Sequence, residues 1–563
     1  MPARKKGSHV KHHGNWITTA GILALALPVC FPLFASQLPA GHDAFFYHPR
    51  LVEFHENIAH WIFLPRWAPD LGAGSGQPLF IFSPPLPYYI AELWHLLGFD
   101  VIVSFSLAAV IAIIASGCFM FLFADYQFGR RAAWLATAAY LYAPYFHVDI
   151  FVRHAFSELM VFPLYPLMLY GFSRYSRETN TLFLLLGAVA WTGVLLSHNP
   201  SALLFAPLLL GFVTFLACRN KSPVTVGKML FAIAAGTALA AFFWLPALAE
   251  SKFVYIERSL QASTNYLDHF VYPSQLWSTT WGFGQSIAGS ADQLSFSFGW
   301  EHLLLIPVTG WLVFSSPKKA LRNWFVVLTG VTAIIALMMT PLSLKAWEKL
   351  PLIRQVQFPW RLLANGSVVL AVIAGVYAAA SEDQRNATAW FWAGLALLVA
   401  PNLSHIGFEK YYPLIASEWT PAAIAMNGIE TTANAEFEPR WVQRRAGYSN
   451  DNVSVVSGTT TVSNLVRTPA VWRMDTDGPA DAVIQVESLY FPGWTVFVDG
   501  TAEATQIVDS GRMQFRVPAG FHHVAVQFRR TTIRFVAELI SAITFAGFLF
   551  LLWRKSFGGI QSR

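Results

Sequence analysis

Long apolar runs dominate the first 404 residues, and each is close to the length that crosses a bilayer. About 20 consecutive apolar residues, wound into an α-helix, span the hydrocarbon core of a membrane. The first run follows four basic residues and is longer than the apolar core of a signal peptide, so we expect it to be retained as a helix. We predict about twelve transmembrane helices, near residues 16–36, 101–124, 131–148, 157–173, 181–197, 201–218, 229–248, 301–315, 323–342, 361–380, 388–404 and 532–553.

The stretch 84–98 (PPLPYYIAELWHLLG) has a different pattern. It is rich in proline and aromatic residues and contains Glu92 and His95. Aromatic side chains gather where a membrane meets water. We therefore expect an interfacial helix lying on the outer face of the membrane, inside a long first outer loop at 37–100.

Residues 405–531 contain no apolar run of spanning length and instead alternate between apolar and polar positions. Segments such as VSVVSG, AVIQVESLYF, WTVFVDG and HHVAVQF are separated by Gly, Pro and Asp. This period of two predicts antiparallel strands, packed as a β-sandwich. We expect Trp494 to lie in the sandwich core, with carbohydrate stacking as the alternative. The chain thus divides into a transmembrane domain at 1–404, a β-rich domain at 405–531, and a last helix with its tail at 532–563.

Composition and charge support a membrane protein and orient it. Charged residues make up 12% of the chain and the mean hydropathy is +0.45, whereas soluble domains carry about 25% charged residues. Of the 38 Lys and Arg residues, 18 lie in the short loops of one side and only 9 in the longer loops of the other. The positive-inside rule then places both termini in the cytoplasm and the β-rich domain outside. Cys30, Cys118 and Cys218 lie in or beside apolar runs, which argues against a disulfide framework or a cysteine metal site.

Ionisable and Pro-aromatic residues concentrate in the outer loops. The first loop contains HDAFFYHPR, the second YAPYFHVDIFVRHAFSE, the third SHNP, and the loop before residue 361 contains RQVQFPWR. Taken singly, such residues are often membrane anchors, and Asp43 has the alternative role of capping a helix that begins near Phe45. Glu158 has the alternative role of an ion-pair partner for Arg153. Because these residues all lie in predicted outer loops, they nevertheless favour a functional site on the outer face of the membrane.

These motifs resemble a bacterial family of polytopic membrane proteins named for its relation to 6-pyruvoyl-tetrahydropterin synthase, which in turn looks like glycosyltransferases of the GT-C fold. The resembling residues are HDAFFYHPRLVEF, PRWAPDLGAGSGQPLFIFSPPLPYYIAELWHLLG, LYAPYFHVDIFVRHAFSELMVFPLYPLMLYG, LLSHNPSALLFAPLLL and QFPWRLL, over roughly 40–210 and 355–365. The tail SLYFPGWTVFVDG…VPAGFHHVAVQFR is similar to the C-terminal β-domain of YfhO-type membrane proteins.

The GT-C resemblance implies transfer of a sugar from a polyprenyl-phosphate donor to a glycan, lipid or protein acceptor at the extracytoplasmic face of the cell (inner) membrane. It implies Asp43 as the catalytic base, because Asp43 matches the acidic residue in the first outer loop of such enzymes. A departing lipid phosphate needs cations, and the candidates for donor binding are Arg361, Arg153, Arg66, His42 and His48. The candidates for substrate binding are Glu158, His154, His198, Asn199, Gln357 and Trp360.

Two further points stay open at this stage. The HDAFFYH motif holds one acid where other members have a pair, which leaves open whether a divalent cation (Mg, Mn or Ca) takes part, since hard ions favour several oxygen ligands. The alternative functions are a lipid or glycolipid flippase or transporter, and a non-catalytic scaffold for glycan assembly. Transporters usually place ionisable residues at mid-membrane, and the predicted spans are almost free of charge in their middles.

Overall fold

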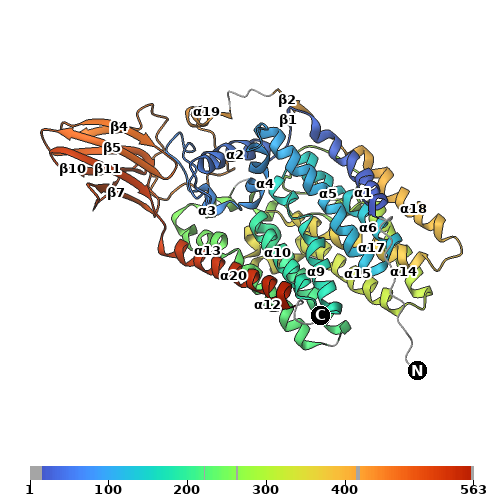
Figure 1. Cartoon of the computed structure of the whole chain (residues 1–563). Helices are drawn as coiled ribbons and strands as arrows, with labels where there is room; N and C mark the ends of the chain where they lie inside the picture. Colours follow the sequence, from blue (N-terminus) through green and yellow to red (C-terminus); the bar gives the residue numbers. More distant parts are fainter. Residues whose placement is uncertain (1–14, 221, 262–263, 351, 414–418, 559–563) are drawn as a thin grey trace.

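The structure, a computed structural model, describes residues 15–220, 222–261, 264–350, 352–413 and 419–558. It is elongated, with a helical bundle at one end and two β-sheets at the other (Figure 1). The helices are α1 Asn15–Cys30, α2 Ala44–Ala59, α3 Leu79–Phe82, α4 Leu86–His95, α5 Val101–Phe128, α6 Arg130–Leu141, α7 Pro144–His147, α8 Phe156–Leu159, α9 Leu164–Glu178, α10 Thr181–Ser197, α11 Asn199–Asn220, α12 Pro223–Leu239, α13 Ala241–Glu250, α14 Trp300–Ser315, α15 Lys319–Met339, α16 Leu344–Lys349, α17 Leu362–Ser381, α18 Ala387–Val399, α19 Pro421–Met426 and α20 Thr532–Gly558.

The chain is a multi-pass membrane protein. Within the described residues, seven helices are long and apolar enough to cross a bilayer: Trp16–Phe34, Val101–Phe128, Asn199–Asn220, Lys319–Met339, Pro359–Ser381, Ala387–His405 and Thr532–Lys555. An eighth span forms if α12 and α13, which meet at a 66° bend, are counted as one.

The sequence predicted about twelve spans, and four of the predicted ranges give shorter helices. Range 131–148 breaks into α6, α7 and a π-helical turn, Val148–Val152, with Pro144 starting the new segment. Range 157–173 contains α8 and α9, separated at Pro163. Proline lacks a backbone N–H and so interrupts the helical ladder. Together with α10 and α14, these helices have fewer than 18 residues, so their status as spans remains a prediction.

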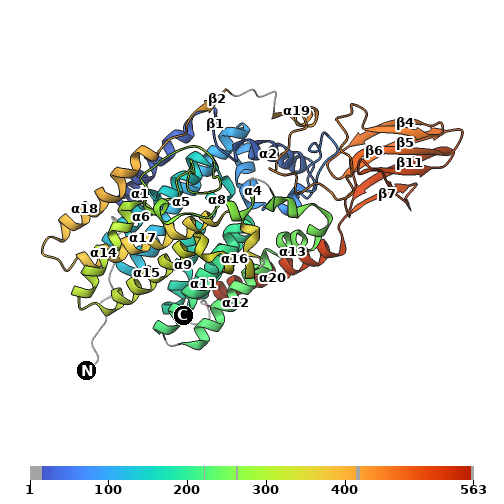
Figure 2. The same cartoon turned by 180° about the vertical axis from the view of Figure 1, so that it is seen from behind.

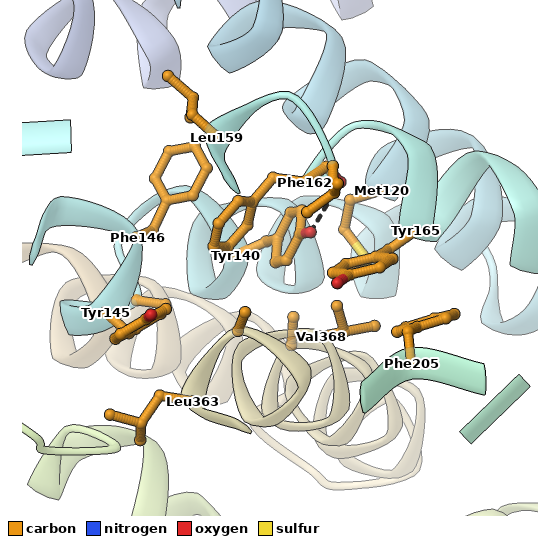
Figure 3. Packing of buried hydrophobic residues seen from close by; sticks show 14 of the residues in the cluster. Met120, Tyr140, Tyr145, Phe146, Leu159, Phe162, Tyr165, Phe205, Leu363 and Val368 are labelled. Atoms are coloured by element: carbon orange, nitrogen blue, oxygen red, sulfur yellow. Dashed lines mark hydrogen bonds between the residues drawn. The ribbon is translucent and has the colours of Figure 1, made fainter. Parts of the chain in front are cut away.

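Helix α17 forms the centre of the bundle, because every one of its residues is buried. It packs against α6, α14 and α15. Figure 3 shows aromatic side chains gathered on this helix near Val368. There the Tyr140 hydroxyl donates a hydrogen bond to the Phe162 carbonyl over 2.8 Å, and the rings of Tyr165 and Phe205 stack at 3.9 Å. The Tyr140 bond satisfies a buried hydroxyl and links α6 to the segment before α9.

Within the described residues, nine antiparallel strands build the second end of the molecule, as the alternating pattern predicted. One sheet has the order β3-β6-β10-β9 and the other β4-β5-β11-β7-β8. The side chains that face inward from both sheets form a single apolar core, which contains Trp494. The strands are β3 Val453–Ser457, β4 Thr461–Arg467, β5 Val471–Gly478, β6 Ala482–Leu489, β7 Trp494–Val498, β8 Thr501–Glu503, β9 Gln506–Ile507, β10 Arg512–Val517 and β11 Gly520–Phe528.

The described residues 406–413 and 419–452 are mostly irregular rather than part of the sheets. They contain the short helix α19 and the strand β2, Tyr411–Tyr412, which pairs with β1, Leu38–Pro39, in the first long loop. The first strand segment that the sequence predicted, VSVVSG, corresponds to β3, Val453–Ser457. Helix α19 lies beside α2 (Figure 2).

The first long loop joins the sheets to the bundle. Trp67 belongs to the core of the sheets and its ring lies 5.5 Å from that of Trp494. The Leu489 backbone N–H donates to the Ser75 carbonyl over 2.8 Å, and Arg467 pairs with Asp70 at 3.3 Å. The sheets are thus fixed to the segment that follows α2. This segment connects the helical bundle with the sheets.

A candidate active-site cavity

Asp43 lies at the N-cap position of α2, but its side chain forms no capping hydrogen bond. The backbone N–H of Asp43 donates a hydrogen bond to the Arg153 carbonyl over 2.9 Å. A capping aspartate would accept a hydrogen bond from the second or third backbone N–H of the helix. Because 35% of the Asp43 side chain is exposed and that bond is not made, the carboxylate is available for another partner.

Arg153 holds a buried cluster of acids beside Asp43. Its Nη1 donates to Asp149 Oδ1 over 2.5 Å and to Glu158 Oε2 over 2.6 Å. The Tyr145 hydroxyl completes the cluster by donating to Glu158 over 2.9 Å. Arg153 Nη2 lies 3.9 Å from Asp43 Oδ2. Two other carboxylates already neutralise this guanidinium, so Asp43 is not needed to do so.

Arg361 approaches the same cluster from the start of α17. Its Nη1 donates to the Val356 carbonyl over 2.7 Å and to Gln357 Oε1 over 3.3 Å. Its Nε is buried without a hydrogen-bond partner and lies 3.9 Å from Glu158 Oε2. The neighbouring Trp360 ring lies 4.8 Å below the Arg153 guanidinium. The arrangement places two guanidiniums and one exposed carboxylate side by side.

A cavity of about 680 Å³ opens over these groups. Its wall includes eight of the predicted site residues: His42, Asp43, Arg153, His198, Asn199, Gln357, Trp360 and Arg361. These residues come from the start of α2, the turn after the π-helical segment, the junction of α10 with α11, and the start of α17. Loops far apart in the sequence thus meet at one site.

His42 and His198 each have a structural hydrogen bond within the wall. His42 Nε2 donates to the Phe283 carbonyl over 3.2 Å and so fixes a loop beside the cavity. Burial lowers the pKa of His42 below its ordinary value, and the charge of Arg153 acts in the same direction. His42 is therefore neutral at pH 7 and does not offer a full positive charge to a phosphate. His198 Nδ1 lies 2.7 Å from Ser201 Oγ.

Four predicted site residues lie outside this wall. Glu158 is 1% exposed and serves as the ion-pair partner of Arg153, the alternative that its spacing allowed. The His48 ring packs against Phe105 and Trp419, because it points from α2 into the helical packing, and burial lowers its pKa to about 4. The His154 ring packs against Phe408. Arg66 bonds to the Phe242 carbonyl and pairs with Glu538, far along the chain.

Two charged wall residues were missed by sequence reasoning. Arg50 lines the cavity and donates a hydrogen bond to the Tyr88 hydroxyl over 3.1 Å. Glu436 also lines the cavity. Asp43 and Arg50 are seven positions apart, which is two helical turns, so helical periodicity would have placed Arg50 on the same face. Glu436 follows an irregular segment and carries no such signal.

The wall does not have the donor set of a divalent-metal site. Its carboxylates are Asp43 and Glu436, and three arginines share the cavity with them. No group of three or more His, Cys, Asp or Glu side chains in the described part of the chain is arranged to hold a metal ion. Hard divalent cations take six or more oxygen ligands, and this wall offers two carboxylates among three guanidiniums.

Comparisons with known proteins give distant similarities. No family model matches the chain. An uncharacterized protein of Lactococcus lactis subsp. cremoris (strain MG1363) is 22% identical over 240 residues, which is 41% of this chain and 39% of that protein. Among solved structures, the arabinofuranosyltransferase AftD from Mycobacteria is similar with a TM-score of 0.44 and 17% identity, over 71% of this chain and 27% of AftD. The archaeal oligosaccharyltransferase AglB from Archaeoglobus fulgidus, solved with an inhibitory peptide and a dolichol-phosphate, gives a TM-score of 0.44 and 12% identity, over 76% of this chain and 61% of AglB.

Proposed function

We propose that the protein is a membrane glycosyltransferase that takes a sugar from a polyprenyl-phosphate donor and transfers it to an extracytoplasmic acceptor, which is a glycan, a lipid or a protein. The observation that carries the proposal is the Asp43 carboxylate, which makes no capping bond and faces a cavity shared with Arg153 and Arg361. The resemblance of the loop motifs to GT-C enzymes points to the same reaction.

Asp43 is the base in this proposal. It removes the proton from an acceptor hydroxyl while the hydroxyl oxygen bonds to the anomeric carbon of the sugar. The bond between that carbon and the lipid phosphate oxygen breaks, and the phosphate leaves with the electron pair. A general base must lie within hydrogen-bond reach of the proton that it takes. An acceptor seated in the 680 Å³ cavity meets this condition at Asp43.

Arg361 binds the departing phosphate, whereas Arg153 positions Asp43. The two arginines differ in how many acids they already contact. Arg153 Nη1 bonds to two buried carboxylates, whereas Arg361 lies no closer than 3.9 Å to one. An arginine with spare N–H groups suits a phosphate, since its fork matches two oxygens at once. Arg50 supplies a further positive charge at the wall.

The β-sheets supply an acceptor surface in this proposal. A groove of about 600 Å³ lies on the outer face of the five-stranded sheet, where Phe497, Arg473, Asp475 and His523 gather. These residues alternate with core residues along their strands and so point away from the core. An aromatic ring among hydrogen-bonding side chains suits a sugar chain. Trp494, by contrast, is 5% exposed and packs in the core, so it does not serve this purpose.

The two competing functions, a transporter and a scaffold for glycan assembly, predict a different set of ionisable residues. A transporter concentrates such residues at mid-membrane along its pathway. In this protein the charged wall residues lie at the starts of α2 and α17 and in the turns between helices. A scaffold for glycan assembly needs no base, yet Asp43 remains available beside the cavity. Both features support an enzyme.

The proposal is tested by incubating the purified full chain with a panel of polyprenyl-phosphate sugars. We expect one donor to lose its sugar by transfer or hydrolysis, with release of the polyprenyl phosphate. Binding of a donor without turnover would favour the scaffold. Movement of an intact glycolipid across reconstituted vesicles, without cleavage, would favour the transporter.

A further inference from the structure

A second cavity, of about 440 Å³, lies where the first long loop, the sheets and α20 meet. It is separate from the cavity of Asp43, because the two walls share no residue. One side is the loop segment 61–67, and the other is the end of β11 with the first turns of α20. The site therefore lies at the point where the chain passes from the sheets into its last apolar helix.

The wall of this cavity is strongly basic. It contains Arg66, Arg529, Arg530 and Arg534, and the carboxylates that pair with them are Glu538 and Glu250. Four guanidiniums thus face two carboxylates, which leaves a net positive charge. No carboxylate in the described part of the chain lies within ion-pair distance of Arg529, whose guanidinium lies over the Phe497 ring.

Arg66 gives a second, independent sign of a ligand. Its side chain is 10% exposed, and its Nε is buried without a hydrogen-bond partner among the described residues. A buried N–H that lacks an acceptor costs about 1–3 kcal/mol. An oxygen-rich anion in the cavity would supply the missing acceptor.

The rim of the cavity is apolar and exposed. Trp61 is 80% exposed, Phe63 58% and Leu64 39%, and together they form a projecting turn in which Trp61 has a φ of +60°. On the other side, Phe535 and Leu539 of α20 are exposed as well. A Trp side chain beside a transmembrane helix is typical of the level where lipid headgroups meet acyl chains. A ligand here has a charged end in the cavity and an apolar end beside the rim.

We infer that this cavity binds the phosphate headgroup of an anionic membrane phospholipid. Arginine forks match phosphate oxygens in pairs, and the exposed turn at 61–64 lies beside the acyl chains. The bound lipid would fix the base of the sheets to the membrane surface and hold the first loop, which also positions Asp43. The inference does not depend on the proposed glycosyl transfer.

Native mass spectrometry of the full chain in detergent tests this inference, with phosphatidylglycerol and phosphatidylcholine offered at equal concentration. We expect one phosphatidylglycerol to be retained in preference to phosphatidylcholine. Arg530→Gln and, separately, Arg529→Gln should each weaken that binding by on the order of tenfold, the loss of one charge-assisted hydrogen bond. Arg516→Gln, an exposed arginine of the same sheets outside the cavity, is the matched control and should bind as the wild type does.

Competition distinguishes the sources of the phosphate. Inorganic phosphate at millimolar concentration should leave phosphatidylglycerol bound, because it lacks the apolar part. Equal retention of both lipids, or unchanged binding in both variants, would refute the inference. Displacement by inorganic phosphate would make the cavity a site for soluble anions. Displacement by polyprenyl phosphate, together with lower turnover of Arg530→Gln, would assign the cavity to the donor and also overturn it.

Discussion

Arg361→Lys separates a phosphate-binding arginine from a membrane anchor. Lysine keeps the positive charge but loses the planar fork of the guanidinium. In Arg361, Nη1 bonds to Val356 and Gln357, whereas Nε has no hydrogen-bond partner among the described residues. The single ammonium of a lysine cannot replace both nitrogens. We expect the loss of at least one charge-assisted hydrogen bond to the donor phosphate. Such a bond contributes about 1.5–3 kcal/mol, which corresponds to about a ten- to hundredfold loss in kcat/KM for the donor.

The assay is steady-state turnover with the active donor at varied concentration, after the melting temperature of the variant has been compared with that of the wild type. Arg354→Lys is the matched control, because Arg354 also bonds to backbone carbonyls, at Trp347 and Glu348, but lies outside the cavity. We expect that control to keep the wild-type value. An Arg361→Lys variant with unchanged kcat/KM would show that the guanidinium only anchors the start of α17.

The remaining predictions concern stability, acceptor binding and topology. Arg153→Gln removes the guanidinium that bonds to the buried carboxylates of Asp149 and Glu158 and should lower the free energy of unfolding by about 3–5 kcal/mol. Arg174→Gln, in a partly exposed pair with Glu178, should lower it by less than about 1 kcal/mol, and equal losses in denaturant unfolding would contradict this. Phe497→Ala should raise KM for the acceptor without slowing donor hydrolysis, while Phe521→Ala, exposed but outside the groove, should not; slower hydrolysis in Phe497→Ala would argue against an acceptor surface. Ala504→Cys, exposed in the connection between β8 and β9, should react with an impermeant thiol reagent in intact cells of a cysteine-free background. Reaction only after lysis would refute the predicted topology.

Hydropathy predicted where the apolar helices lie but not where they break. Residues 361–380 were predicted as a span and form α17, the most buried helix of the bundle. The range 131–148 was also predicted as a span, yet it ends as a helix at Leu141 because Pro144 begins a new segment and a π-helical turn follows. This break places Arg153 and Asp149 beside Asp43. A window average does not register one proline, so the irregular turn that builds the site escaped prediction.

Sequence reasoning selected loops that meet, but it could not tell which side chains face the cavity. Asp43, Arg153 and Arg361 lie together as the shared outer side suggested. Glu158 lies five residues from Arg153 and faces inward as its partner, because a buried guanidinium requires a carboxylate. Arg66 was grouped with these residues because it lies in the same predicted outer loop. Its side chain instead contacts the Phe242 carbonyl and Glu538 of α20. The direction in which a loop side chain points depends on its tertiary contacts, and a single sequence does not reveal these contacts.

Asp43→Asn tests the central claim most directly, namely that the Asp43 carboxylate is the base of a sugar transfer. Asparagine caps a helix about as well as aspartate, so the variant should fold and melt like the wild type. Asp100→Asn is the matched control, because Asp100 does cap its helix, accepting a hydrogen bond from the Val103 N–H over 2.9 Å, and lies outside the cavity. Loss of a general base costs about a hundredfold to ten-thousandfold in rate. We therefore predict that kcat falls by this factor in Asp43→Asn and stays unchanged in Asp100→Asn, whereas a well-folded Asp43→Asn protein with wild-type turnover would contradict the assignment.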